Sequence, residues 1–129
     1  MSTSLAGANM MMFDVWGSWE LVVMDYFRVE VERRNGVAVV RAVGELDVAS
    51  NSQLTNALAG AFSAHAVVLD LAGVTYFDAS GVRLLRHARD DAGGHGCTFA
   101  VERASRIVRT VLEIVDELDL LDDASQPAN

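Results

Sequence analysis

Alternating apolar and charged residues mark the first ordered part of the chain. FRVEVERR, residues 27–34, has the two-residue period of a half-buried strand. Asn35-Gly36 follows it, and because both residues tolerate positive φ, this pair favours a tight hairpin turn. VAVVRAV, residues 37–43, is therefore predicted to be the antiparallel return strand.

The pattern then changes to a helical period. Between residues 44 and 62 the apolar residues recur three and four positions apart, which predicts one buried stripe: Leu54, Ala57, Leu58, Ala61 and Phe62. Asp47 or Ser50 can cap the first turn of this helix. The next segment, AVVLDL at residues 66–71, is short and almost continuously apolar, which is typical of a strand covered on both faces.

The second half of the chain repeats the alternation of helix and strand. Helical spacing runs from Val82 to Ala92, and the glycine-rich residues 93–96 end it. CTFAV, residues 97–101, predicts a fourth strand. Ser105 can cap a third helix, whose inward residues are predicted to be Ile107, Val108, Val111, Leu112, Ile114 and Val115.

The predicted order is β-β-α-β-α-β-α, an α/β fold with a small mixed sheet and flanking helices. Strand–helix–strand units give parallel neighbours through right-handed crossovers, and the hairpin adds one antiparallel edge. We expect one domain at residues 26–122. Residues 1–25 are an extension of unknown role, and the polar residues 123–129 form a tail.

Composition narrows the function classes. The 129 residues are 51% hydrophobic and carry a net charge of −8, which favours a folded globule and disfavours binding to a nucleic-acid backbone. Cys97 is the only cysteine, so an internal disulfide and a multi-cysteine zinc site are excluded. No apolar window approaches the ~20 residues of a membrane span. No nucleotide motif is present, and we expect no cofactor and a cytoplasmic location.

The segment Asp78-Ala79-Ser80-Gly81 is the first candidate site. It follows a central strand and opens a helix, where open α/β sheets usually bind ligands. A helix start tolerates a phosphate, so a phosphoserine there would change the surface that a partner meets. The structural alternative is that Asp78 or Ser80 caps the helix and Gly81 allows a close approach. From these four residues alone, this alternative is favoured.

A second turn, Gly44-Glu45-Leu46-Asp47, also ends a strand before a helix. If both turns lie at the same end of the sheet, Glu45, Asp47 and Asp78 form one acidic patch. Taken alone, the turn is more simply a solvated loop with a helix cap. Hydrolase chemistry is disfavoured, because His87 lies two helical turns from Ser80, roughly 10 Å away, and a Ser–His pair needs about 3 Å.

Three segments together resemble the STAS domain of bacterial anti-sigma-factor antagonists, over residues 27–121. They are VEVERRNGVAVVRAVGELDVASNSQL, VVLDLAGVTYFDASGVRLL and ASRIVRTVLEIVDELDLL. The resemblance implies a non-enzymatic regulator that binds an anti-sigma factor, itself a serine kinase, and so releases a sigma factor. It also implies that the kinase ends binding by phosphorylating a serine at the start of the second helix, and that a metal-dependent, PPM-type phosphatase restores it.

The resemblance also assigns roles to positions of this chain. Glu45 and Asp47 match the turn near the switch, Asp78 matches the acid before the acceptor, and Gly81 matches the closing glycine. The chain departs from the family at Ala79, which occupies the usual acceptor position, and its hydroxyl, Ser80, comes one residue later. Either Ser80 has become the acceptor or the chain stays in the binding state.

The first hypothesis is therefore an anti-sigma factor antagonist that docks through Glu45, Asp47 and the segment 78–81. The rival is a STAS adaptor subunit without a phosphorylation cycle, as in stressosome-like assemblies or lipid-transport ATPase complexes. Ala79 favours the rival, whereas the acidic turns favour the antagonist. The sequence leaves the oligomeric state open, and a dimer is compatible with it.

Overall fold

The computed structural model describes residues 26–122, so the predicted extension and tail lie outside the described residues. One four-stranded sheet has the order β1-β2-β3-β4. The strands are β1 (Phe27–Arg34), β2 (Val37–Leu46), β3 (Ala66–Phe77) and β4 (Thr98–Ala104). β1 is antiparallel to β2, and the other neighbours are parallel, which confirms the predicted mixed sheet with one antiparallel edge.

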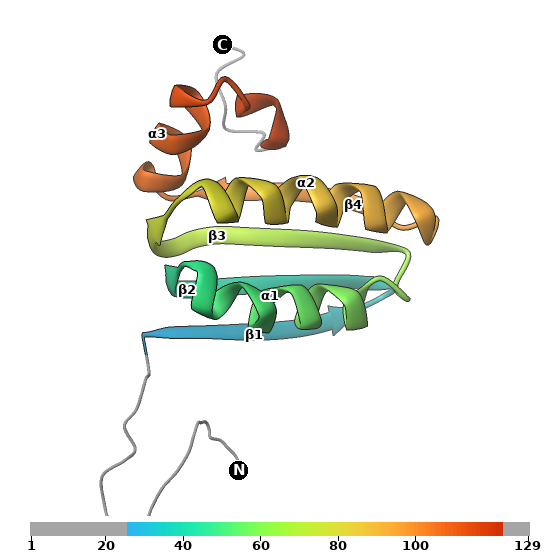
Figure 1. Cartoon of the computed structure of the whole chain (residues 1–129). Helices are drawn as coiled ribbons and strands as arrows, with labels where there is room; N and C mark the ends of the chain where they lie inside the picture. The colour runs from blue at the N-terminus through green and yellow to red at the C-terminus, as the bar shows by residue number, and fades with distance from the viewer. Residues whose placement is uncertain (1–25, 123–129) are drawn as a thin grey trace, which may run out of the picture.

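The helices are α1 (Val48–Ala61), α2 (Ala79–Gly94), α3 (Arg106–Ile114) and the short 3₁₀ helix η1 (Leu118–Leu120). The element order confirms the predicted β-β-α-β-α-β-α fold. α1 and α2 lie across one face of the sheet, and α3 stands beyond its β4 edge (Figure 1). Within residues 26–122, no helix combines the length and the apolar character that crossing a membrane requires.

The core lies between the sheet and the pair α1 and α2. Alternate residues of β2 and β3 point toward these helices and are at most 1% exposed: Ala38, Val40, Ala42, Val67, Leu69 and Leu71. α1 supplies Leu54 and α2 supplies Leu85, both fully buried. Burying one such leucine contributes roughly 1.5–3 kcal/mol relative to leaving it exposed.

Three strands are longer than predicted, and the first of them, β2, reaches Leu46 rather than Val43. The sequence predicted a strand at 66–71, but β3 continues to Phe77, and β4 covers 98–104 rather than 97–101. The small and polar residues after Leu71 gave no apolar pattern from which the extension of β3 could be predicted. It is stabilised by pairing with the end of β2, where Leu46 lies opposite Phe77, and both side chains are buried.

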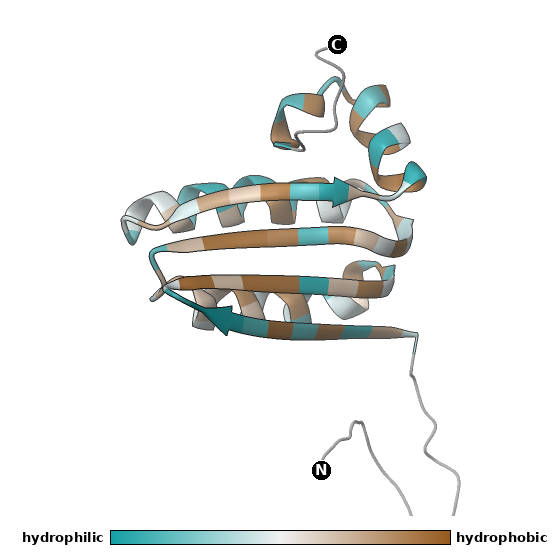
Figure 2. Cartoon of the chain, turned by 180° about the vertical axis from the view of Figure 1, so that it is seen from behind, coloured by the Kyte–Doolittle hydropathy of each residue, from teal (hydrophilic) through white to brown (hydrophobic). Residues whose placement is uncertain are grey.

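The prediction that residues 66–71 are covered on both faces is wrong for the single chain. Leu69 and Leu71 face the helices, whereas Val68 and Asp70 lie on the opposite face. No described helix covers that face, on which apolar residues surround a few charged ones (Figure 2).

The predicted inward set of the third helix is also partly wrong. Val108 and Leu112 are fully buried, but Ile114 is 76% exposed and Val115 is 42% exposed. α3 packs beside the edge of the sheet, so only a narrow stripe of it is covered. The helix ends at Ile114, and Asp116 then turns the chain with a positive φ of 60°.

Gly44 sits where β1 begins and β2 nears its end. Its φ is +111°, and a Cβ placed on it would lie 1.9 Å from the carbonyl oxygen of Tyr26. That close approach lets Glu45 N–H donate a 2.8 Å hydrogen bond to the same oxygen. A glycine is therefore required at this position.

We predict that Gly44→Ala lowers the free energy of unfolding by at least about 1–3 kcal/mol, because the new methyl group meets fixed backbone in a strained conformation. Gly60→Ala is the matched control, since Gly60 lies in α1 with open space around it and should gain up to about 1 kcal/mol. Urea denaturation of both variants measures the difference. Equal stability of Gly44→Ala and wild type would contradict the assignment.

Candidate functional site

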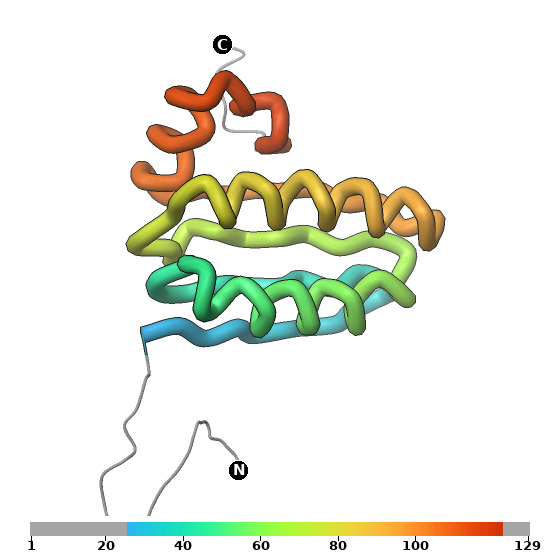
Figure 3. Tube along the Cα trace, viewed as in Figure 1, coloured from blue at the N-terminus to red at the C-terminus, as the bar shows by residue number. Residues whose placement is uncertain are grey.

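The two acidic turns lie side by side. β2 and β3 run parallel, and their final residues, Leu46 and Phe77, are register partners. The next residue in each case, Asp47 or Asp78, is the N-cap of the following helix. Both helices therefore begin at the same end of the sheet, where β1 also starts (Figure 3). The structure brings together Glu45, Asp47 and Asp78, which the sequence analysis made conditional on both turns lying at one end of the sheet.

Asp47 caps α1 through a reciprocal capping box. Its carboxylate accepts from Ser50 N–H at 3.0 Å, and the Ser50 hydroxyl accepts from Asp47 N–H at 2.9 Å. The same hydroxyl donates to the Glu45 carbonyl at 2.8 Å, and Ser50 is only 4% exposed. These bonds fix the turn backbone, while the Glu45 side chain stays exposed.

Asp78 caps α2 with the help of Ser80. Asp78 Oδ1 accepts from Ser80 N–H at 3.0 Å and from the Ser80 hydroxyl at 2.6 Å. Ser80 is 6% exposed, so its hydroxyl is a buried donor rather than a surface group. On the other side, Ser80 C=O accepts from the Asn51 side-chain amide at 3.2 Å, which ties α2 to α1.

The hydrogen bonds around Asp78 lower the pKa of its carboxyl. Partial burial alone would raise this pKa, because the charged form loses water. Bonds from the Ser80 hydroxyl and N–H, from Tyr76 and from Gly81 N–H stabilise the charged form and outweigh burial. Asp78 is therefore a stable carboxylate near neutral pH and a poor general base.

Ala79 and Gly81 differ sharply in exposure. Ala79 is the first residue of α2 and is exposed, at the position that the resemblance assigns to the phosphate acceptor. Gly81 is buried against Phe77, whose ring lies 2.4 Å from where a Cβ would be. Gly81 therefore lets the first turn of α2 rest on the end of β3, as the structural alternative proposed.

Three residues at this end were missed by the sequence analysis. Val48 is 73% exposed at the start of α1, and Tyr76 is 46% exposed at the end of β3. The Tyr76 hydroxyl donates to Asp78 Oδ2 at 3.3 Å. Tyr26 contributes the carbonyl that holds Glu45. Once β3 is known to reach Phe77, alternation along the strand points Tyr76 outward, but the predicted strand stopped too early to show it.

The pKa values of the two tyrosines reflect the acidic surroundings. The charge of Asp78 raises the pKa of Tyr76 most, followed by their hydrogen bond, burial, and the charges of Asp47 and Glu45. Burial first, and then Asp47 and Glu45, raise the pKa of Tyr26. Asp47 and Glu45 thus raise the pKa of both tyrosines, and Asp78 raises that of Tyr76.

This end of the molecule is a candidate for a protein-docking surface. We define the docking surface as Glu45, Asp47, Val48, Tyr76, Asp78 and Ala79. Exposed apolar and aromatic groups lie beside carboxylates, a combination that suits an apolar and basic partner. Within residues 26–122, no group of three potential metal ligands occurs.

The family model of the STAS domain matches residues 28–125. The chain belongs to the STAS domain family. The match covers the whole described sheet except its first residue, together with every described helix, so both helix caps lie inside the STAS domain.

Solved structures share this fold. An anti-sigma factor antagonist from Mycobacterium paratuberculosis is 22% identical, with a TM-score of 0.69, covering 84% of this chain and 93% of that one. The unphosphorylated anti-sigma factor antagonist SpoIIAA is 19% identical, with a TM-score of 0.64 and coverage of 78% and 91%. The phosphorylated form of the Bacillus cell fate determinant SpoIIAA is 18% identical, with a TM-score of 0.59 and coverage of 78% and 95%. At these identities, the likeness establishes the STAS fold.

We predict that Asp78→Ala destabilises the STAS domain by about 0.5–2 kcal/mol at pH 7, the usual cost of losing an N-cap. Because the folded pKa of Asp78 is lowered, its charge stabilises the fold above the unfolded pKa of about 3.9. That part of the stability is lost as the pH falls through the lower folded pKa. The gap between wild type and variant should therefore narrow in acid.

Urea denaturation at several pH values between 7 and 3 measures this gap. Asp90→Ala is the control, because Asp90 is an exposed acid on the same helix. A gap for Asp78→Ala that stays constant across this range would contradict the charged cap.

Proposed function

We propose that this STAS domain is an anti-sigma factor antagonist that binds its anti-sigma factor without a phosphorylation switch. Family membership and the fold shared with two structures described as anti-sigma factor antagonists support the first part. The docking surface supports a protein partner. The domain acts by binding and not by catalysis, and ATP would belong to the partner kinase.

The exposed Ala79 is the observation on which the second part depends. It occupies the accessible first position of α2 and has no hydroxyl to receive phosphate. A relative of the same fold exists in a phosphorylated form, so the fold itself accommodates the modification. The loss of the acceptor side chain leaves this chain in the binding state.

The burial of Ser80 argues against its use as a replacement acceptor. Its hydroxyl would have to leave the Asp78 carboxylate, and a hydrogen bond to a charged group contributes about 1.5–3 kcal/mol. A phosphate on Ser80 would also bring about two negative charges against Asp78. The cap that holds α2 in place therefore opposes phosphorylation of Ser80.

Tyr76 is the expected anchor of the complex. Aromatic side chains dominate binding energy when a partner buries them, and Tyr76 is half exposed beside the helix start. Its hydrogen bond to Asp78 holds the ring in place before binding. The surrounding carboxylates would pair with basic side chains of the anti-sigma factor and speed encounter.

We predict that the wild-type chain binds a kinase-type anti-sigma factor and gains no phosphate in the presence of ATP and magnesium. Ala79→Ser restores a hydroxyl at the exposed position and should become a substrate. Phosphorylation should then release Ala79→Ser from the kinase. Intact-mass spectrometry and binding titrations, with and without ATP, measure both effects.

The double variant Ala79→Ser/Ser80→Ala is the matched control, because its only hydroxyl in this turn is at position 79. Phosphate on Ser80 of the wild type would overturn the switch-free part of the proposal. Failure to bind any candidate anti-sigma kinase, with recovery in a membrane transport complex, would instead support the adaptor hypothesis.

We predict that Tyr76→Ala weakens binding to the anti-sigma factor by roughly 30-fold or more, the effect of removing about 2 kcal/mol from an interface hot spot. Tyr76→Phe keeps the ring and loses only the hydroxyl, so it should retain most of the affinity. Calorimetric titration compares the two variants at equal fold content by circular dichroism. Unchanged affinity in Tyr76→Ala would remove Tyr76 from the docking surface.

A further inference from the structure

The face of the sheet opposite α1 and α2 is a second surface, and we call it the open face. β2 and β3 contribute most of its apolar residues, and all of them are half-buried: Val37, Val39, Val43, Ala66 and Val68, with Ala100 from β4. Figure 2 shows this face without a covering helix. At its carboxyl end it adjoins the docking surface, because Glu45 and Tyr76 alternate with the buried Leu46 and Phe77 and so lie on this side of the sheet.

The sequence of the central strands is that of strands covered on both faces. VAVV in β2 and AVVL in β3 are continuous apolar runs, a pattern found where both faces are buried. A sheet with one face in water normally alternates apolar and polar residues. The outer edge strand β1 follows that alternation, with charged residues on the open face. The centre of the open face therefore has the composition of an interface.

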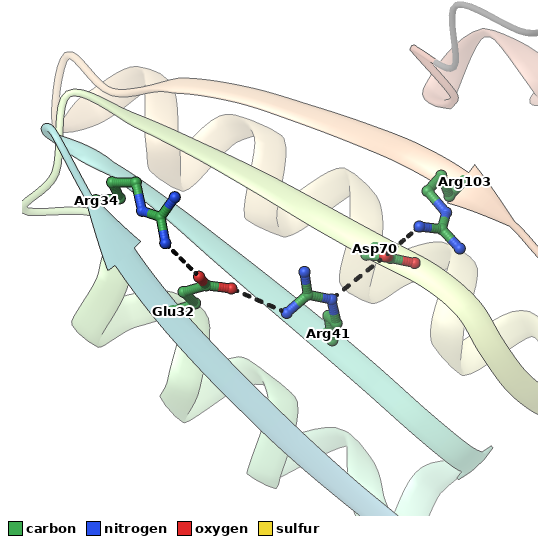
Figure 4. Close-up of polar contacts among 5 residues, drawn as sticks. All are labelled: Glu32, Arg34, Arg41, Asp70 and Arg103. Carbon is green, nitrogen blue, oxygen red and sulfur yellow. Dashed lines mark hydrogen bonds and ion pairs between the residues drawn. The ribbon is translucent and has the colours of Figure 1, made fainter.

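A row of charges crosses the open face from strand to strand (Figure 4). Glu32 of β1 pairs with Arg41 of β2 at 3.3 Å, and Arg41 pairs with Asp70 of β3 at 3.7 Å. Asp70 also pairs with Arg103 of β4 at 3.7 Å. The Asp70 side chain is only 11% exposed, so this carboxylate is held at the centre of the face.

The backbone of β4 is distorted so that Arg103 joins this row. The register with β3 shifts after Asp70, which leaves Arg103 as an extra residue in β4. Its φ is +62°, an uncommon conformation for a residue other than glycine. Such a bulge re-aims a side chain, and here it brings the guanidinium to Asp70.

The central charges are self-complementary about one particular axis. Arg41 and Asp70 are register partners on adjacent strands. A two-fold axis that runs parallel to the strands, between β2 and β3, stacks β2 of one copy on β3 of the other. Arg41 then faces Asp70 of the second copy, and the reverse contact forms by symmetry. An axis across the strands would instead stack Arg41 on Arg41, which is repulsive.

The same axis also matches the apolar residues. Val39 and Val68 are register partners, so each would face the other residue of the second copy. Val37 and Ala66 are matched in the same way. The charged side chains of β1 and β4 then form an exposed rim, in which Glu30 lies opposite Glu102 of the second copy, around a centre of valines and alanines crossed by Arg41 and Asp70.

We propose that two copies of this chain form a homodimer by stacking their open faces, with the two-fold axis parallel to the strands. Four strands at about 4.8 Å and eight residues at about 3.3 Å give a face of roughly 500 Å² per copy. The total of roughly 1,000 Å² is at the lower limit for a specific interface, so we expect a concentration-dependent dimer.

The test uses three full-length variants: Val39→Lys, Val68→Glu, and the double variant Val39→Lys/Val68→Glu. Each single change places an unpaired charge against a valine of the second copy, so each should weaken dimerisation at least roughly tenfold. The double variant places the introduced lysine of each copy opposite the introduced glutamate of the other, and it should dimerise again. Sedimentation equilibrium over a range of concentrations measures the dissociation constants.

An equimolar mixture of the two single variants should also form a heterodimer, with one lysine–glutamate pair and one valine pair. Val48→Lys is the control, because Val48 is exposed at the docking surface and away from the open face. It should leave dimerisation unchanged. Circular dichroism confirms that each variant is folded.

The proposal is overturned if the wild type is a monomer at every concentration, in which case residues 1–25 or another protein would be the occupant to test. It is also overturned if the single variants dimerise like the wild type. Single variants that fail without rescue by the double variant would exclude the stated axis. Because binding to the anti-sigma factor is measured separately, failure of the dimer leaves the proposed function intact.

Discussion

The parallel pairing of β2 with β3 positions both surfaces of this STAS domain. At the carboxyl end of the pair, Leu46 lies opposite Phe77, so the caps Asp47 and Asp78 become neighbours. At its centre, Arg41 lies opposite Asp70 on the open face. A slip of one residue would turn each side chain to the other face. The buried side chains between the sheet and the helices prevent such a slip, and so they hold the docking surface and the charge row in place.

The hydrogen bonds that cap α2 limit the availability of Ser80 as a phosphate acceptor. A hydroxyl that donates to Asp78 stabilises the helix start, and a phosphate acceptor must instead be free to reach a kinase. In this chain the buried hydroxyl of Ser80 takes the structural role, and the exposed position carries Ala79. Capping the helix and accepting a phosphate therefore require two different side chains. Under the proposed function, an alanine at the exposed position removes the switch, while Ser80 keeps the cap.

The sequence predicted the element order and the mixed sheet, because hydrophobic periodicity and helix caps are local signals, and this order made it possible for the two acidic turns to share one end of the sheet. It did not predict that the side chains of Tyr76 and Ile114 are exposed. Tyr76 was missed because β3 continues through small and polar residues that only the pairing with β2 stabilises. Ile114 was placed in the core because its spacing is helical, but α3 covers an edge of the sheet and buries only a narrow stripe. The length of a strand and the width of a buried stripe depend on tertiary contacts that no local pattern records.

The orientation of the proposed dimer has a consequence for the proposed antagonist. An axis parallel to the strands preserves strand direction, so both docking surfaces lie at the same end of the dimer, with Glu45 and Tyr76 of each copy beside the stacked faces. A partner with two binding sites could engage both copies, and the second contact would form at high effective concentration. In an antagonist without a phosphate switch, the affinity for the anti-sigma factor has to be regulated in another way. Dimerisation near the working concentration would supply it, because affinity for a two-site partner would then rise with the amount of antagonist.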